Sequence, residues 1–141
     1  MRFMILVKAS AESEAGVMPG EDMFAVMAAY HDQLAKAGVL LDASGLQPSA
    51  KGWRIHYAGG QRQVIDGPFA ESKELIAGYT IIQVRSREEA LEWTRRFPAP
   101  HGDGAQAEIE VRQMYELDDF GPSEAVERFR RLGVGGSQPA A

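Results

Sequence analysis

The spacing of apolar residues predicts alternating strands and helices in the first half of the chain. Apolar side chains recur at three- and four-residue intervals after Asp22, the pattern of an amphipathic helix of about four turns, and Gly38 stands where a C-cap residue is expected. Alternation of apolar and polar residues on both sides of Gly59 and Gly60 is typical of a β-hairpin. We therefore expect a strand over 1–8, a loop over 9–20, a helix over 22–38, a strand from Val39 and a hairpin over 53–65.

The second half shows the same kinds of signal. Ser86 and Glu89 form a capping-box pattern at the start of a second helix, and Pro98 ends it. The order of the elements predicts an α+β domain of the ferredoxin-like βαββαβ plan with an inserted hairpin. We expect a strand over 75–84, a helix over 86–97 and a strand over 107–117. The domain is placed at 1–121, and 122–141 is expected to add a short helix over 123–132 and a flexible tail over 133–141.

The first strand is apolar on both of its faces. Phe3 and Ile5 alternate with Met4 and Leu6, yet two helices can cover only one face of a four-stranded sheet. At about 25 cal/mol per Å² of apolar surface, leaving the second face in water forgoes several kcal/mol. We therefore predict a homodimer in which two sheets face each other. The alternative is that the C-terminal helix covers this face within one copy.

Composition and charge exclude several classes of protein. The formal net charge of −5 argues against a nucleic-acid partner, which requires clustered Lys and Arg. The chain contains no cysteine, so disulfides and thiolate chemistry are ruled out. The apolar run at the start is shorter than a signal sequence requires, and no run approaches a membrane span. We expect a cytoplasmic protein without a membrane partner.

Charged residues follow the predicted hairpin closely. Asp66, Glu71, Lys73 and Glu74 lie within nine residues and are candidates for the rim of a pocket, with Asp66 as a general base. The alternative is that Asp66 holds the turn that Gly67 and Pro68 form, while its charged neighbours lie in water. Phe69 fits a core position better than a stacking surface. Lys8 and Arg54 are candidates for binding an anionic molecule or are solvated charges at strand edges.

The chain carries three histidines, which are candidate proton carriers or metal ligands. His31 lies at the edge of the first helix's apolar stripe and is expected to line the same cavity as the charged cluster. His56 is expected to face a barrel interior beside Arg54, and His101 to be exposed. Their spacing contains no metal-binding pair, so we predict neither a metal nor a cofactor.

The segment Asp66-Gly67-Pro68-Phe69, followed by Glu71 to Glu74 and Gly78-Tyr79, resembles the signature of the DGPF-type branch of YCII-related proteins. The resemblance spans residues 1 to about 121. It implies a dimeric α/β barrel, in a family that mostly lacks an assigned reaction and is often encoded near alternative sigma factors. Some members carry a histidine and an aspartate as a proposed acid–base pair. This chain has Met27 and Phe97 where those residues are expected, so that pair is not carried over.

The sequence is compatible with two functions. The first is a homodimer that binds a small organic molecule between the sheet and the first helix, with or without cofactor-free acid–base chemistry. The second is a regulatory protein that associates with a sigma factor. The predicted catalytic residues are Asp66 and His31, and the predicted ligand-binding residues are Lys8, Arg54, Gly67, Pro68, Phe69, Glu71, Lys73 and Glu74.

Overall fold

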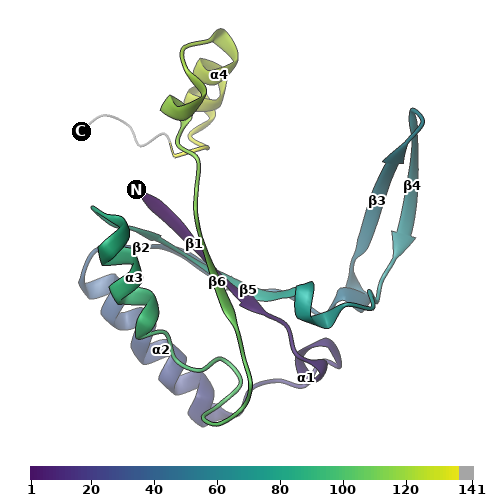
Figure 1. Ribbon diagram of the computed structural model, residues 1–141, viewed down its shortest axis with the longest axis vertical. Coiled ribbons are helices and arrows are strands. Elements are labelled where there is room, and N and C mark those ends of the chain that lie inside the picture. The colour runs from purple at the N-terminus through teal and green to yellow at the C-terminus, as the bar shows by residue number, and fades with distance from the viewer. Residues whose placement is uncertain (137–141) are drawn as a thin grey trace.

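The computed structural model describes residues 1–136, and its main body is one antiparallel sheet in the strand order β2-β5-β1-β6 (Figure 1). This order, with a helix after the first and third strands of the sheet, is the ferredoxin-like plan that the sequence predicts. The sheet strands are β1 (Arg2–Lys8), β2 (Leu40–Gly45), β5 (Ile76–Gln83) and β6 (Ile109–Gln113). The inserted hairpin is β3 (Trp53–Ala58) and β4 (Gln61–Asp66), and the α-helices are α1 (Ala11–Glu14), α2 (Glu21–Lys36), α3 (Arg87–Arg95) and α4 (Glu124–Leu132).

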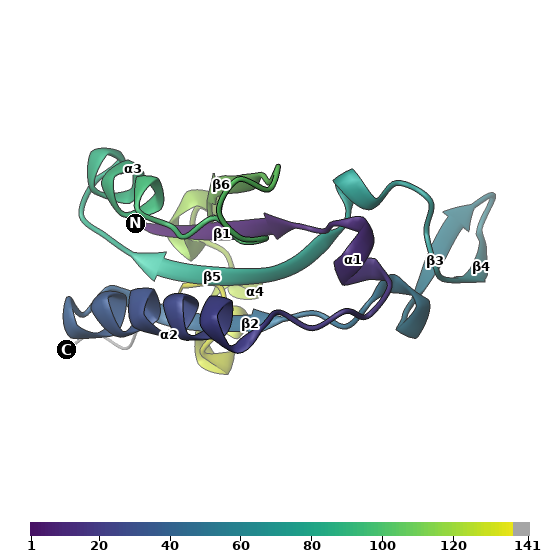
Figure 2. The same cartoon turned by 90° about the horizontal axis from the view of Figure 1, so that it is seen from below.

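Helices α2 and α3 lie together on one face of the sheet (Figure 2). The side chains between them and the sheet form the core, because the helical stripe and one alternating set of strand residues point at each other. Ile5, Leu34 and Ile82 are fully buried. The other buried members of this core are Phe3, Tyr30, Val39, Val84 and Ala90.

The ends of the helices follow the capping signals in the sequence. Glu21 and Asp22 place negative charge in the first turn of α2, and Gly38 has φ +74°, as a left-handed residue after the helix requires. The hydroxyl of Ser86 accepts from the amide of Glu89 at 3.1 Å at the start of α3. The sequence analysis missed α1, a single turn in which the side chains of Ser10 and Ser13 cap each other's backbone amides.

The second face of the sheet remains uncovered within one copy. Met4, Leu6, Tyr79 and Ile81 point away from α2 and α3 and are only half-buried. Helix α4 packs mainly against the short 3-10 turn η3 (Leu117–Phe120) and extends away from the sheet (Figure 1). The alternative that α4 covers this face is therefore wrong, and we refer to it as the open face.

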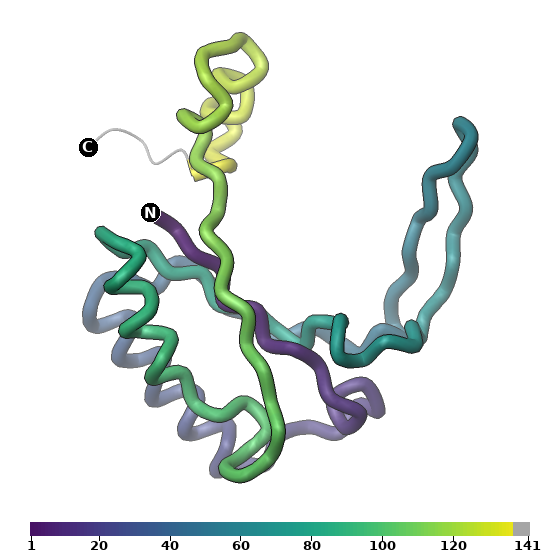
Figure 3. Tube along the Cα trace, in the orientation of Figure 1, coloured from purple at the N-terminus to yellow at the C-terminus, as the bar shows by residue number. Residues whose placement is uncertain are grey.

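The hairpin extends away from the body on the same side as α4 (Figure 3). Its two strands pair only with each other, and every residue in them is exposed. The exposed fractions of Trp53, Tyr57 and Val64 are 63%, 64% and 63%. An isolated two-stranded hairpin is marginally stable in water, and apolar side chains exposed in this way mark a candidate interaction surface. His56 is exposed on this arm in the single copy, and its expected place toward a barrel interior stays a prediction.

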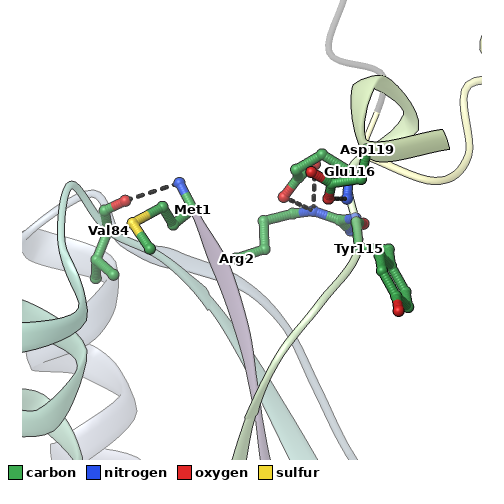
Figure 4. Close-up of polar contacts among 6 residues, drawn as sticks. All are labelled: Met1, Arg2, Val84, Tyr115, Glu116 and Asp119. Carbon is green, nitrogen blue, oxygen red and sulfur yellow. Dashed lines mark hydrogen bonds and ion pairs between the residues drawn. The ribbon is translucent and has the colours of Figure 1, made fainter. Parts of the chain in front are cut away.

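The C-terminal segment is held to the first strand by Arg2 (Figure 4). Its Nε donates to the Oε1 of Glu116 at 3.0 Å, and a terminal guanidinium nitrogen donates to the carbonyl of Tyr115 at 2.8 Å. The amide of Glu116 donates to Asp119, which fixes the start of η3. Gly135 and Gly136 lie close to Leu117 and to this ion pair, and the expected flexible tail over 133–141 stays a prediction. Residues 137–141 lie outside the described part of the chain.

Replacing Leu34 by Ala should lower the free energy of unfolding by about 2–5 kcal/mol, because the change leaves a cavity at a position with no exposed surface. Leu91 on α3 is 47% exposed, so Leu91→Ala is the matched control and should cost about 1 kcal/mol or less. Urea denaturation followed by tryptophan fluorescence measures both. Equal losses in the two variants would contradict the assignment of the core.

Candidate functional site

A cavity of about 420 Å³ lies between the first half of α2, the sheet and the loop that follows α3. Small residues of β2 and β5 form its floor, because Ala43, Gly45 and Gly78 leave room that larger side chains would fill. Met23, Met27 and Phe97 contribute apolar side chains to its walls. We call this space the helix-side cavity. Its position matches the pocket expected between the sheet and the first helix.

His31 and Thr80 are the polar pair of the helix-side cavity. The Nδ1 of His31 lies 2.8 Å from the carbonyl oxygen of Met27, and its Nε2 lies 2.8 Å from the Oγ1 of Thr80. A carbonyl oxygen only accepts, so Nδ1 must carry a proton. In the neutral imidazole Nε2 is then the acceptor, and the hydroxyl of Thr80 donates to it. The backbone of α2 therefore selects one tautomer of His31.

Aromatic side chains fix the orientation of the imidazole. The rings of Tyr30 and Phe97 stand edge-on to that of His31, with centroids 5.6 and 6.3 Å away. The hydroxyl of Tyr30 donates to the carbonyl of Trp93 at 2.7 Å, and burial raises the pKa of Tyr30 to about 12. Tyr30 therefore stays neutral at physiological pH and has a structural role beside His31.

No Asp, Glu, Lys or Arg side chain lines the helix-side cavity among residues 1–136. Among these residues His31 is the titratable side chain of the wall, because Tyr79 borders the cavity from β5 while its side chain points to the open face. Tyr79 donates its hydroxyl to the carboxylate of Asp42 at 3.2 Å, and this hydrogen bond raises the pKa of the Tyr79 phenol. The imidazole of His31 with its hydroxyl partner Thr80 is thus the acid–base group that this wall offers within the described residues.

The predicted charged cluster lies elsewhere. A second hollow of about 280 Å³ adjoins the base of the hairpin, and Arg54, Phe69 and Glu74 line it. The guanidinium of Arg54 stacks on the ring of Phe69, 3.8 Å from its centroid. His31 is absent from this hollow, so the expectation of one cavity shared by His31 and the cluster is wrong. The cause is the hairpin, which carries residues 53–66 away from α2.

Asp66, Glu71 and Lys73 do not line either space. All three side chains are exposed, and none of them makes a hydrogen bond or an ion pair within the described residues. Their role as ligand-binding residues stays a prediction. Within residues 1–136, no contact places the side chain of Asp66 in a pocket, and none shows it accepting hydrogen bonds that would hold the turn.

The rest of the signature segment holds the base of the hairpin. A Cβ on Gly67 would overlap the carbonyl of Ser49, so no larger residue fits beside this backbone. The peptide bond between Gly67 and Pro68 is cis. The amide of Phe69 donates to the hydroxyl of Ser49 at 3.1 Å, and Ser49 also binds the carboxylate of Glu14 through its amide and hydroxyl. These contacts join β4 to the turn η1 (Ser49–Lys51) and to α1.

The remaining candidates occupy separate places. Lys8 pairs with Glu110 at 3.5 Å on the edge of the open face. His101 was expected to be exposed, but it is half-buried and its Nε2 lies 3.1 Å from the carbonyl of Lys8. No group of three or more His, Cys, Asp or Glu residues is arranged for a metal ion in the described part of the chain. Across the same residues, none of the helices has the length and apolar character needed to cross a bilayer.

Thr80 is the functional candidate that sequence analysis missed. It is the polar residue of the buried row of β5, opposite Ile5 of β1 and Ala43 of β2. A threonine within a strand is common, so its hydroxyl carries no signal of its own. The contact with His31 depends on how α2 packs on β5, which the sequence around Thr80 does not reveal.

The YCII-related domain model matches residues 1–115. The chain belongs to the YCII-related family. This YCII-related protein is 30% identical over 107 residues to an uncharacterised protein of Rhizobium meliloti (strain 1021), covering 76% of the present chain and 82% of that protein. Its fold is also similar to that of 5-chloro-2-hydroxyhydroquinone dehydrochlorinase from Burkholderia phenoliruptrix, solved with 2,5-dihydroxybenzoquinone. That match has a TM-score of 0.45 and 14% identity, over 82% of this chain and 95% of the other.

Gly67→Ala should lower the free energy of unfolding by about 2–3 kcal/mol, because the backbone of Ser49 must move to admit the methyl group. The matched control is Gly52→Ala. Its Cβ would lie 3.7 Å from the same carbonyl oxygen, an ordinary contact, so it should change stability by less than about 1 kcal/mol. Thermal and urea denaturation measure the stability of both variants. An unchanged free energy of unfolding in Gly67→Ala would contradict the structural role of this segment.

Proposed function

We propose that this YCII-related protein is a homodimer that binds a small uncharged organic molecule in the helix-side cavity of each copy. The observation that carries the proposal is a cavity with apolar walls and one oriented polar pair, His31 with Thr80. Binding pockets for small molecules combine these two features, because apolar contact supplies affinity and few polar groups fix the orientation.

The walls select against charged ligands. Moving an ion out of water into an apolar space is costly unless an opposite charge meets it, and the described lining offers none. Met23 and Met27 add adaptable thioether side chains that can follow the outline of a ring or chain. The volume of about 420 Å³ is within the range of typical small-molecule pockets. A neutral molecule of one or two rings meets these conditions.

Pairing with a second copy is supported by the open face. Its central residues are Met4, Leu6, Tyr79 and Ile81, with Asp42 at one edge and Lys8, Glu110 and Arg112 at the other. An apolar centre with a charged rim is the usual anatomy of a protein interface. A second identical face satisfies this pattern without any other protein.

The charges of the two arms that flank the open face also favour a second copy as its partner. The hairpin arm (51–66) carries three basic residues and one acidic residue, a net charge of +2 with His56 neutral. The C-terminal arm (115–134) carries five acidic and three basic residues, a net charge of −2. The arms rise at opposite ends of the face (Figure 1). A twofold axis at right angles to the line between them brings opposite charges together across the dimer.

Cofactor-free acid–base chemistry is the reaction class that fits the cavity. The imidazole of His31 is held in one tautomer, and proton transfer requires such a positioned group. The charged cluster around Asp66 is proposed only as a secondary site beside the second hollow. The alternative role, association with a sigma factor, stays a prediction.

Ala28→Phe should abolish ligand-induced stabilisation, because Ala28 lines the helix-side cavity and a phenyl ring would fill it. Wild-type protein should gain about 2–3 kcal/mol at a hundredfold excess of a bound compound over its Kd. Differential scanning fluorimetry across a panel of uncharged aromatic alcohols and ketones, with carboxylates of the same size, measures the effect.

The control is Ala29→Phe, at an exposed position of α2 that does not line the cavity. It should keep the wild-type response, and only uncharged compounds should stabilise the protein. A response that survives in Ala28→Phe, or stabilisation by the carboxylates alone, would place the ligand elsewhere.

Leu6→Arg should produce a monomer, because a guanidinium in the centre of the open face would be buried without a partner in the dimer. Multi-angle light scattering at micromolar concentration should give twice 15.4 kDa for wild type and 15.4 kDa for the variant. Leu91→Arg, at an exposed position of α3, should remain dimeric. A monomeric wild type would refute the pairing.

A further inference from the structure

We propose that Thr80 relays a proton from a ligand hydroxyl to His31, so that the substrate class of the helix-side cavity is a neutral molecule with an acidic O–H group, such as a phenol or an enol. This inference rests on the proposed function of the cavity. It adds a second reacting side chain and a chemical requirement on the ligand.

The hydrogen-bond directions around His31 determine the relay. Nδ1 is committed as a donor to the carbonyl of Met27 at 2.8 Å, so Nε2 is the nitrogen that can gain a proton. The Oγ1 of Thr80 lies 2.8 Å from Nε2 and donates its hydrogen to it. A hydroxyl has two lone pairs and one hydrogen. A lone pair on the Oγ1 of Thr80 is therefore available to accept a hydrogen bond from a ligand in the cavity.

The proposed proton transfer is balanced without a co-reactant. The ligand O–H bond breaks and its proton bonds to Oγ1 of Thr80, while the original hydrogen of Thr80 moves to Nε2 of His31. The products are a ligand oxyanion, an unchanged threonine and an imidazolium. The imidazolium keeps both hydrogen bonds, because Nδ1 still donates to Met27 and Nε2 now donates to Thr80. No electron is transferred.

The titratable groups around His31 are engaged elsewhere, so His31 is the group that accepts the proton. Tyr30 packs against the imidazole from α2, and its phenol is engaged with the carbonyl of Trp93. Tyr79, from β5, is engaged with Asp42. Arg96 lies beyond Tyr30 and lowers the pKa of that phenol slightly against the larger effect of burial. None of the described residues that line the cavity carries a carboxylate or a permanent positive charge.

The test compares 4-nitrophenol with its methyl ether, 4-nitroanisole, on the full-length protein. Wild type should bind the phenol about tenfold more tightly, the worth of one hydrogen bond to the ligand. Bound phenol should show the phenolate absorbance band about one pH unit below the pH at which the free phenol is half ionised. Isothermal titration calorimetry gives the affinities and absorbance spectroscopy gives the ionisation state.

Variants at each position distinguish the role of Thr80 from that of His31. Thr80→Val should bind both compounds equally and show no phenolate at that pH, and Thr80→Ser should restore both signals. His31→Gln should retain the preference for the phenol but lose the phenolate band. Circular dichroism melts establish that each variant is folded, and Thr80→Ala, which also removes the hydroxyl, takes the place of Thr80→Val if that variant does not fold.

The outcomes distinguish the relay from the cavity. Equal binding of both compounds by wild type, or a phenolate band that persists in Thr80→Val, overturns the relay and leaves the binding site intact. Failure of wild type to bind either compound overturns the site as well. A phenol preference and a phenolate band that require Thr80, with the band also requiring His31, support the relay.

Discussion

A four-stranded sheet has two faces, and the two long helices of this chain can shield only one of them. The contact of α2 and α3 with Ile5 and Ile82 buries the core and leaves Met4, Leu6 and Ile81 toward solvent. The hairpin arm and the C-terminal arm then stand free on the uncovered side (Figure 1). Both the proposed dimer and the place of the cavity follow from this division of the sheet.

The helix-side cavity exists because small residues occupy the part of β2 and β5 that faces the first half of α2. Leu34 packs tightly where β5 carries Ile82, but further along the strand the side chains give way to Thr80 and Gly78. A Cβ on Gly78 would lie 3.0 Å from the carbonyl of Ser44, so the two strands also approach closely at this point. The first half of α2 therefore faces a thin floor, and the space between them is kept open beside His31.

The sequence predicted the fold well because its signals are local. Alternation defined β1 and β5, and Ser86, Gly38 and Pro98 marked helix ends through their own backbone preferences. The site was predicted only in part. His31 was identified from its place on α2, but Thr80 lies 49 positions further along the chain and meets it through the packing of α2 on β5, which no local pattern encodes. The charged cluster was placed beside His31 in error, because the direction of an inserted hairpin depends on tertiary contacts at Ser49 and Phe69.

The segment 66–69 fixes how the hairpin arm leaves the body. Gly67 leaves no room for a Cβ beside the carbonyl of Ser49, and the amide of Phe69 donates to the hydroxyl of the same residue. In the proposed dimer, a residue that altered this angle would misplace the hairpin arm against the C-terminal arm of the second copy. The helix-side cavity lies on the other face of the sheet and would keep its shape, so assembly and ligand binding could be changed separately.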